Sequence, residues 1–204
     1  MTRIANRSAA RRYRSELRDE QAQATRERIL DAAMRVMARG IASLSVPAVA
    51  REAGVSTPTV YRHFGTKRDL LTAVYPHAAR QAGLDQLVPP RTIGELRDGV
   101  RAYFSRLDRM GADARAAMAS PAADEVRHAT MANRLPVWNQ LAASVQPPLA
   151  AADRERLARI LTVLITSASM RMWHDHIGVS VEQAADDIEW LVNAAVTASR
   201  RQEP

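Results

Sequence analysis

Apolar residues recur every three or four positions along most of this chain, and no segment alternates strictly between apolar and polar residues. This spacing is typical of amphipathic helices, so no β-sheet is expected. The clearest case is a helix predicted from about Ala22 to Arg39. Its buried face is expected to hold Ile29, Leu30, Ala33, Met34 and Met37.

Residues suited to helix ends divide the N-terminal third into short helices. Gly40 and Gly54 lie where a residue with left-handed backbone commonly ends a helix. Ser45 is placed to cap a second helix, and Ser56 a third. A fourth helix is expected to begin at Thr66, which has an acidic residue three positions later, as in a capping box.

The rest of the chain predicts longer helices. Thr92 and Glu95 match a capping box, a long helix is expected from Asp153 to near Gly178, and a last one from Ser180 to Ser199. Helix-breaking residues are expected to divide the middle of the chain at Gly111, Pro121, Pro136, Pro147 and Pro148. The fold class is therefore expected to be all-α, with about nine helices.

Charge is distributed unevenly along the chain. The net charge is +7, and residues 1–75 hold 14 Lys+Arg against 7 Asp+Glu, while the remaining residues hold 15 of each. A basic segment attached to a neutral body favours a polyanionic partner, of which DNA is the commonest.

Several classes of protein are disfavoured by what the sequence lacks. The absence of cysteine excludes disulfides and thiolate sites, and no apolar run approaches the roughly 20 residues of a membrane span. The arginine-rich start does not resemble a secretory signal, so a cytoplasmic protein is expected. Without a glycine-rich phosphate loop or a nucleophile elbow, we expect no enzyme and no cofactor. His174 and His176 would point about 200° apart on one helix and could share a metal only if the helix had ended, so no metal is expected.

The segment Val46–Phe64, VPAVAREAGVSTPTVYRHF, meets the requirements of a helix-turn-helix. Ala50 supplies a small residue where two helices cross, and Gly54 supplies the turn. Val55 and Val60 are expected to face the core, which leaves hydroxyl, guanidinium and imidazole groups outside to contact phosphates and base edges. A tight helical hairpin with a polar face would show the same spacing.

The residues around this motif favour DNA binding. Thr25–Tyr75 resembles the DNA-binding domain of the tetracycline-repressor (TetR) family in two stretches, RERILDAAMRVMARG and SVPAVAREAGVSTPTVYRHFGTKRDLLTAVY. The part VYRHFGTKRDLL is especially specific, because it joins a recognition helix, a short turn and a lysine that starts the next helix. The resemblance covers about a quarter of the chain. It implies a basic arm (1–21), a three-helix helix-turn-helix DNA-binding domain (22–75) and a helical ligand-binding and dimerisation domain (76–204).

The resemblance also implies roles for individual residues. Thr57, Thr59 and Arg62 would face the major groove, and Tyr61 and His63 would touch backbone phosphate. The full set of expected DNA-binding residues is Ser45, Thr57, Pro58, Thr59, Tyr61, Arg62, His63 and Lys67.

Two residues of this region are expected to contact phosphates, and two prolines depart from the family pattern. Lys67 looks like the family's phosphate-contacting lysine, and Ser45 could offer its hydroxyl and amide to another phosphate. Pro58 stands where other members often carry a different small residue, so a base preference does not transfer. Pro76 is unusual for the family's fourth helix, and a kink or early end there would alter the link to the sensing domain.

The N-terminal arm has two interpretations. It carries little apolar content and could be helical from about Ala9. It could follow the minor groove or the phosphates, as in other helix-turn-helix proteins, or be a solvated tail. Its arginines are Arg3, Arg7, Arg11, Arg12, Arg14 and Arg18.

The last two helices, about 153–176 and 180–199, carry more apolar positions than one face needs. Val163, Met170 and Trp190 lie off the main apolar faces, which suggests a partner surface as well as a core. The resemblance assigns this pair of helices to a four-helix homodimer interface, whereas a plain core role is the alternative. A dimer would hold two recognition helices one DNA turn apart (about 34–36 Å), which predicts a palindromic operator.

Between the DNA-binding region and these helices lie residues that could line an effector pocket or belong to ordinary core. Methionine adapts to irregular apolar shapes, and tryptophan offers a hydrogen-bond donor. The candidates are Tyr103, Leu107, Met110, Met118, Met131, Trp138, Leu141, Met170, Trp173 and His174. The balanced charge of this part favours an apolar or weakly polar effector.

The sequence therefore predicts a DNA-binding transcriptional regulator, which the resemblance makes a repressor released from its operator by a small molecule. A regulator without an effector, or an activator, is the alternative. The expected partners are double-stranded DNA, an unidentified effector and a second copy of the chain, with no membrane.

Overall fold

The computed structural model describes residues 2–39, 44–119 and 124–201, and within these ranges the regular structure is entirely helical. This confirms the expected all-α class. Ten α-helices are described where about nine were predicted, because the long helix expected after Asp153 is divided. None of the described helices is both long enough and apolar enough to cross a membrane.

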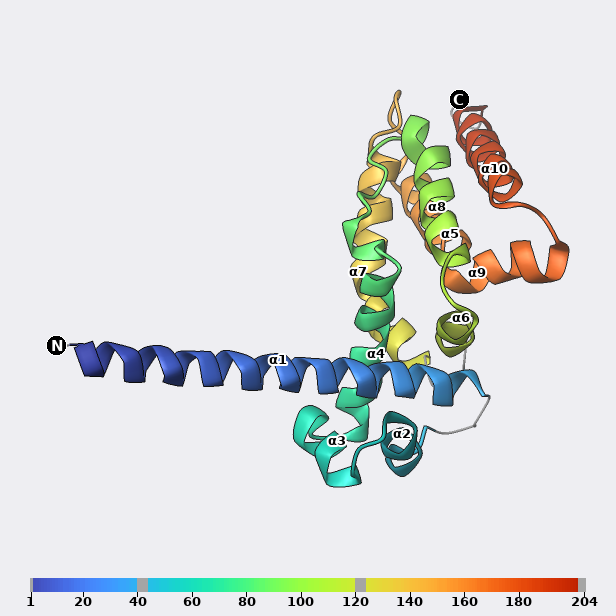
Figure 1. Ribbon diagram of the computed structural model, residues 1–204. Helices are drawn as coiled ribbons and strands as arrows, with labels where there is room; N and C mark the ends of the chain where they lie inside the picture. The colour runs from blue at the N-terminus through green and yellow to red at the C-terminus, as the bar shows by residue number, and fades with distance from the viewer. Residues whose placement is uncertain (1, 40–43, 120–123, 202–204) are drawn as a thin grey trace.

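The first helix is much longer than predicted. α1 spans Thr2–Ala38 without interruption, so the expected arm and the expected first helix are one element, which projects well beyond the rest of the molecule (Figure 1). The C-terminal part of α1 is amphipathic, and its predicted apolar face is buried, with Ile29 and Leu30 fully so. Gly40 and the side chains of residues 1–15 lie outside the described residues.

Capping residues set the bounds of α2 (Val46–Ala53) and α3 (Thr57–Phe64) as the sequence predicted. The Ser45 hydroxyl accepts from the Ala48 amide at 3.2 Å, and the Ser56 hydroxyl accepts from the Thr59 amide at 3.3 Å. Gly54 ends α2 with φ 65° and ψ 36°, a left-handed conformation that glycine adopts without a steric penalty.

Helix α4 (Lys67–Gln81) joins the two halves of the molecule. It begins with the predicted capping box, in which Thr66 and Asp69 exchange hydrogen bonds. Pro76 lies inside the helix and does not end it. His77, the residue after Pro76, attaches α4 to α1. It is buried, and its Nε2 lies 2.7 Å from Asp31 Oδ1 of α1.

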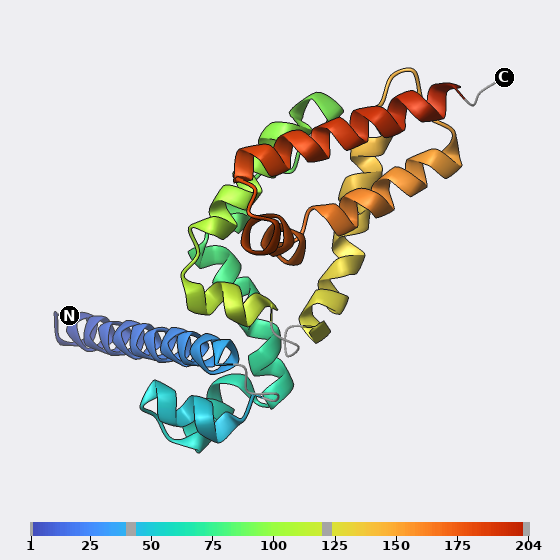
Figure 2. The same cartoon turned by 90° about the vertical axis from the view of Figure 1, so that its right-hand side faces the viewer.

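The remaining helices lie on the opposite side of α1 from α2 and α3, with α4 passing between the two groups (Figure 1). α6 packs on α1, α7 on α8, and α10 on α5; Figure 2 shows α10 lying along the outer side of this group. Their bounds are α5 Leu96–Asp108, α6 Ala112–Ala119, α7 Asp124–Ala143, α8 Ala151–Leu164, α9 Ser167–Arg171 and α10 Val181–Arg201, with short 3-10 segments at Leu84–Gln86 and Ile93–Glu95 and a π-helical segment at Met172–Ile177.

The expectation of one helix from Asp153 to near Gly178 was wrong. α8 begins at Ala151 and ends at Leu164, and Thr166 starts a new helix by forming a capping box with Ser169. The local hydrogen bonds of Thr166 compete with helix continuation. Because the chain changes direction there, Met170 is buried and does not lie on an outer apolar surface as predicted.

Two other expectations in this half were also wrong. Pro136 does not break the chain, because α7 continues through it and is anchored on its C-terminal side by the buried Trp138 and Leu141. Thr92 makes no side-chain capping bond, because the Glu95 carboxylate accepts from the Arg91 amide instead, at 2.8 Å. Pro121 lies outside the described residues.

Candidate nucleic-acid interface and ligand cavities

The orientation of α3 is fixed by its apolar side chains. Val60 and Phe64 are buried, and the Arg26 guanidinium of α1 lies 4.8 Å from the centre of the Phe64 ring, a cation–π contact. The opposite side of the helix is consequently turned to solvent. Tyr61 and Arg62 are exposed there.

The other predicted DNA-binding residues lie on the same three-helix unit. Thr57, Thr59 and His63 are half-buried, whereas Pro58 is exposed. The Thr59 hydroxyl lies 2.9 Å from that of the capping residue Ser56, so it is already engaged within the helix.

The N-termini of α2 and α4 carry the remaining predicted residues. Ser45 and Lys67 are both exposed, although the Ser45 hydroxyl oxygen is used to cap α2. Sequence reasoning missed Arg68, an exposed cation next to Lys67 in the first turn of α4; its position beside Lys67 was the available signal. Helix N-termini favour anions, since they carry free amide groups and a positive dipole end.

Ion pairs hold α2 against α1. The Glu52 carboxylate accepts from Arg35 at 2.8 Å and from Arg39 at 2.9 Å. These two guanidinium groups hold the pKa of Glu52 below its usual value. α3 is therefore packed on two helices, α1 and α2, that are joined by ion pairs.

His63 is poorly suited to carry a charge in the free protein. Its burial lowers the pKa of the imidazole, and the nearby cations Arg62 and Arg26 lower it further. A phosphate placed beside His63 would act in the opposite direction, since an anion stabilises the protonated ring.

Two neighbouring cavities in the described part of the C-terminal half share a wall. The first, of about 340 Å³, opens between α4, α5 and α7, and the second, of about 380 Å³, lies beside α8 and α9. Tyr75 and Arg134 line both and so stand between them.

Arg134 is the centre of the polar contacts at these cavities. Its Nη2 donates to the hydroxyls of Tyr75 and Tyr103, at 3.1 Å each, and its Nη1 to the Ile165 carbonyl at 3.5 Å. Burial of the Tyr103 hydroxyl raises its pKa to about 12. Sequence reasoning missed Arg134 and Tyr75; a lone arginine just before the run Leu135–Trp138 was the signal that could have found Arg134.

The predicted pocket residues do not form one site. Tyr103 and Trp138 line the first cavity and Met131 the second, whereas Leu141 is fully buried core and Trp173 is half-buried against the core. His174 is exposed, with Nδ1 at 3.0 Å from Asp175. The others surround a void of about 10 Å³, too small for a ligand: Leu107, Met110, Met118 and Met170.

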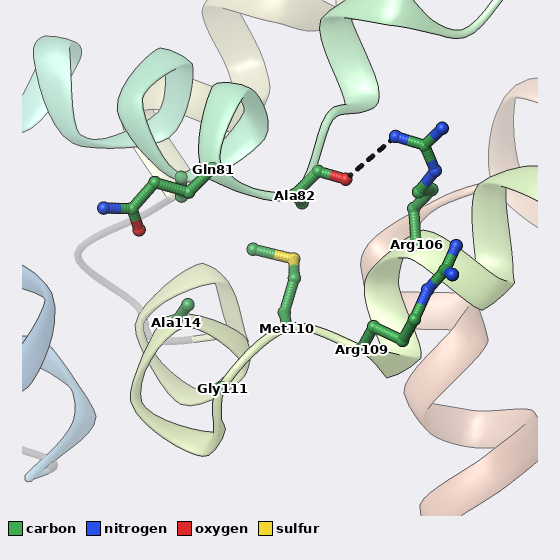
Figure 3. A pocket seen from close by; sticks show the side chains of 8 residues that line it. Gln81, Ala82, Arg106, Arg109, Met110, Gly111 and Ala114 are labelled. Atoms are coloured by element: carbon green, nitrogen blue, oxygen red, sulfur yellow. Dashed lines mark hydrogen bonds between the residues drawn. The ribbon is translucent and has the colours of Figure 1, made fainter.

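The C-terminal end of α4 is tied to α5. Arg106 donates to the carbonyls of Ala82 and Gly83, at 3.4 and 2.9 Å, beside a surface hollow of about 490 Å³ that Met110 and Arg109 also line (Figure 3). A guanidinium at this position stabilises the negative end of the helix dipole. α4 is thus held at one end by the DNA-binding unit and at the other by α5.

The two histidines near the end of α9 belong to one short segment. Both His174 and His176 lie in the π-helical segment Met172–Ile177. Across the described ranges, no group of three or more histidine, aspartate or glutamate side chains could hold a metal ion.

The paired helices α2 and α3, with their glycine turn and outward polar face, define a helix-turn-helix domain of the DNA-binding class. Residues 29–74 match the family described as bacterial regulatory proteins, tetR family. This match is confined to the N-terminal helix-turn-helix part of the chain.

Individual relatives match over the same part of the chain. An HTH-type transcriptional regulator, SrpR of Pseudomonas putida, is 42% identical over 66 residues, which cover 32% of this chain and 30% of SrpR. AcrR of Shigella flexneri, also an HTH-type transcriptional regulator, is 39% identical over 57 residues, covering 28% of this chain and 26% of AcrR. The matched part thus spans less than a third of the length of either relative.

A solved structure extends the likeness to the whole fold. The crystal structure of a tetR-family transcriptional regulator from Streptomyces coelicolor superposes with a TM-score of 0.58 at 22% identity, covering 89% of this chain and 84% of that one. At this identity the likeness concerns the fold alone.

Proposed function

We propose that this protein is a transcriptional regulator that binds DNA through the exposed face of α3. The observation that carries the proposal is the mounting of α3, whose Val60 and Phe64 are buried while Tyr61 and Arg62 face solvent. Lys67 and the neighbouring Arg68 supply cations at the N-terminus of α4. Direct contacts to bases would come from α3, and contacts to phosphates from the helix N-termini.

We further propose that the protein acts as a homodimer through α8 and α10. Val163 is 70% exposed and Trp190 72% exposed, which is unusual for large apolar side chains in one chain alone. A second copy would cover both, and Trp190 lies beside a shallow hollow of about 600 Å³ on α10 in which another side chain could insert. The operator would then be palindromic, since a two-fold axis relates the two recognition helices.

Release from the operator by an effector is the regulatory step that we propose, which makes the protein a repressor. α4 carries Lys67 at its start and Tyr75 at the wall of both cavities, and its C-cap residue Ala82 accepts a hydrogen bond from Arg106. A ligand that binds one position of α4 more tightly than another would shift the population of that position and so move the recognition helix.

In-vitro selection of bound DNA from a random pool tests the DNA-binding proposal. We expect a palindrome whose half-sites are centred about 34–36 Å apart. Arg62→Ala should reduce affinity and relax the preference at one base position. Arg101→Ala, which removes an exposed arginine of α5, is the matched control and should change neither. Recovery of no enriched sequence would contradict the proposal, and enrichment of a single unpaired half-site would contradict the dimer.

A further inference from the structure

We propose that Arg134 anchors the anionic head of an effector, a monocarboxylate whose apolar body occupies the first cavity between α4, α5 and α7. The inference rests on the proposed function, because it names the ligand class of the sensing site.

The positive charge of Arg134 is not balanced by any described carboxylate. Among the described residues no carboxylate forms an ion pair with this guanidinium, although Arg35, Arg39 and Arg97 each have one. Its hydrogen-bond partners in the described part of the chain are two tyrosine hydroxyls and one carbonyl, all neutral. A half-buried cation with neutral partners only has lost hydration without gaining a counter-charge, which is unfavourable. An anion from outside the chain would supply that charge.

Two tyrosine hydroxyls lie beside the guanidinium of Arg134. The hydroxyls of Tyr75 and Tyr103 accept from the same nitrogen of Arg134, and a phenolic hydroxyl can donate as well as accept. The raised pKa of Tyr103, about 12, keeps that proton in place at neutral pH. A planar guanidinium flanked by two hydroxyl donors suits a carboxylate, whose two oxygens accept several hydrogen bonds.

The size and lining of the first cavity suit a small, mainly apolar molecule. Its volume of about 340 Å³ lies within the range of small-molecule sites. Apart from Arg134 and the tyrosines it is apolar, with Leu84, Leu87, Pro90, Val137 and Trp138 around it. Arg134 is the one cation among the described residues that line the cavity, so the ligand should carry one negative charge on an apolar body. Val88, at the same cavity and 73% exposed, marks its opening to solvent.

Helix α4 connects this cavity to the proposed DNA-binding helices. Tyr75 belongs to α4, the helix that starts at Lys67, and its bond to Arg134 of α7 joins the two halves of the molecule. A carboxylate bound to Arg134 would also accept from the Tyr75 hydroxyl, which would connect the ligand to α4. The ligand would thereby change the anchorage of α4.

Calorimetric titration of the full-length protein with decanoate, and separately with decanol, tests the inference. The two molecules share an apolar chain and differ in the charge of the head group; naphthalene carboxylate and naphthalene methanol provide a second, aromatic pair. We expect at least one carboxylate to bind at least tenfold more tightly than its alcohol, the ratio that one charge-assisted hydrogen bond provides. If neither carboxylate binds, or if both alcohols bind equally well, the inference is overturned.

Variants locate the preference. Arg134→Gln should remove the carboxylate preference, Arg134→Lys should keep most of it, and Arg101→Gln on the surface of α5 should leave it unchanged. Thermal melting identifies any variant that fails to fold, and the comparison of acid with alcohol on the unaltered protein needs no variant. A preference that survives in folded Arg134→Gln would overturn the assignment to Arg134.

The selection of DNA described above separates the two proposals. DNA binding without carboxylate binding would overturn the anion site and leave the regulator. Carboxylate binding that depends on Arg134, in a protein that selects no DNA, would overturn the regulator and leave the anion site.

Discussion

Replacement of Gly54 by alanine isolates the contribution of backbone conformation to the helix-turn-helix. A Cβ at this position would meet no atom within 4 Å, so the substitution causes no clash, but φ is +65°. The left-handed conformation costs a non-glycine residue about 1–2 kcal/mol. Reduced freedom of the unfolded chain returns roughly 0.4–1 kcal/mol. We therefore expect a net loss of about 1 kcal/mol in the free energy of unfolding, equivalent to ~2–4 °C in melting temperature for a chain of this length.

The measurement is thermal or urea unfolding followed by circular dichroism at one fixed protein concentration, because self-association shifts the apparent stability. Gly94→Ala is the matched control: it is exposed, its φ is not positive, and a Cβ would lie 4.0 Å from the Thr92 hydroxyl. It should leave stability unchanged or raise it by up to roughly 1 kcal/mol. Gly54→Asn should lose less than Gly54→Ala, since asparagine tolerates the left-handed region. Equal stabilities for Gly54→Ala and Gly94→Ala would refute the reasoning.

Three further substitutions test the interface proposals. Lys67→Gln should weaken DNA binding almost uniformly across sequences and reduce the salt slope of the binding constant by about one, because one phosphate contact is lost. Bound DNA should raise the lowered pKa of His63, so that the complex binds more protons than the free protein. The affinity for DNA should therefore rise as the pH falls through and below 6.5. His63→Gln should flatten this pH dependence in fluorescence-anisotropy titrations. Trp190→Ala should weaken self-association more than tenfold in sedimentation equilibrium, because a side chain that is 72% exposed in one chain would be covered in the dimer.

Each of these three has an outcome that would contradict it. An unchanged salt slope would remove Lys67 from the interface. A pH dependence that persists in His63→Gln would assign the titration to another group. Unaltered self-association of Trp190→Ala, with Arg101→Ala as the surface control, would place the dimer contact away from the middle of α10.

Local chemistry made much of the fold predictable from the sequence. Ser45, Ser56 and Thr66 cap helices in the structure as predicted, because the hydrogen bond of an N-cap involves residues only two or three positions away. Ser180 and Gln183 likewise exchange the hydrogen bonds of their predicted capping box. The predicted capping box at Thr92 failed because another nearby hydrogen bond competed with it. The Glu95 carboxylate accepts from the Arg91 amide, and the Thr92 side chain makes no capping bond.

The cavity was less accessible to prediction than the helices. Tyr75, Tyr103 and Arg134 come from three helices and are separated by 31 and 59 residues along the chain from their hydrogen-bond partners, so no local pattern brings them together. Methionine and tryptophan positions gave an ambiguous signal, because the same residues fill an ordinary core: Met118 and Met170 are buried around a void of about 10 Å³. The residues of the proposed DNA-binding face, by contrast, lie within one contiguous segment of the chain.

Because α1 is long, a small rotation at its point of attachment moves its N-terminal end by several ångströms. It is continuous from Thr2 to Ala38, and near its C-terminal end Asp31 is held 2.7 Å from His77 of α4. With a rise of about 1.5 Å per residue, the backbone at Thr2 lies ~44 Å from that attachment, so a tilt of roughly 5° would displace it by ~4 Å. Pairs of spin labels at the start of α1 in the proposed dimer would therefore report, as a readily measured change in distance, rotations of α4 too small to detect within the helix itself.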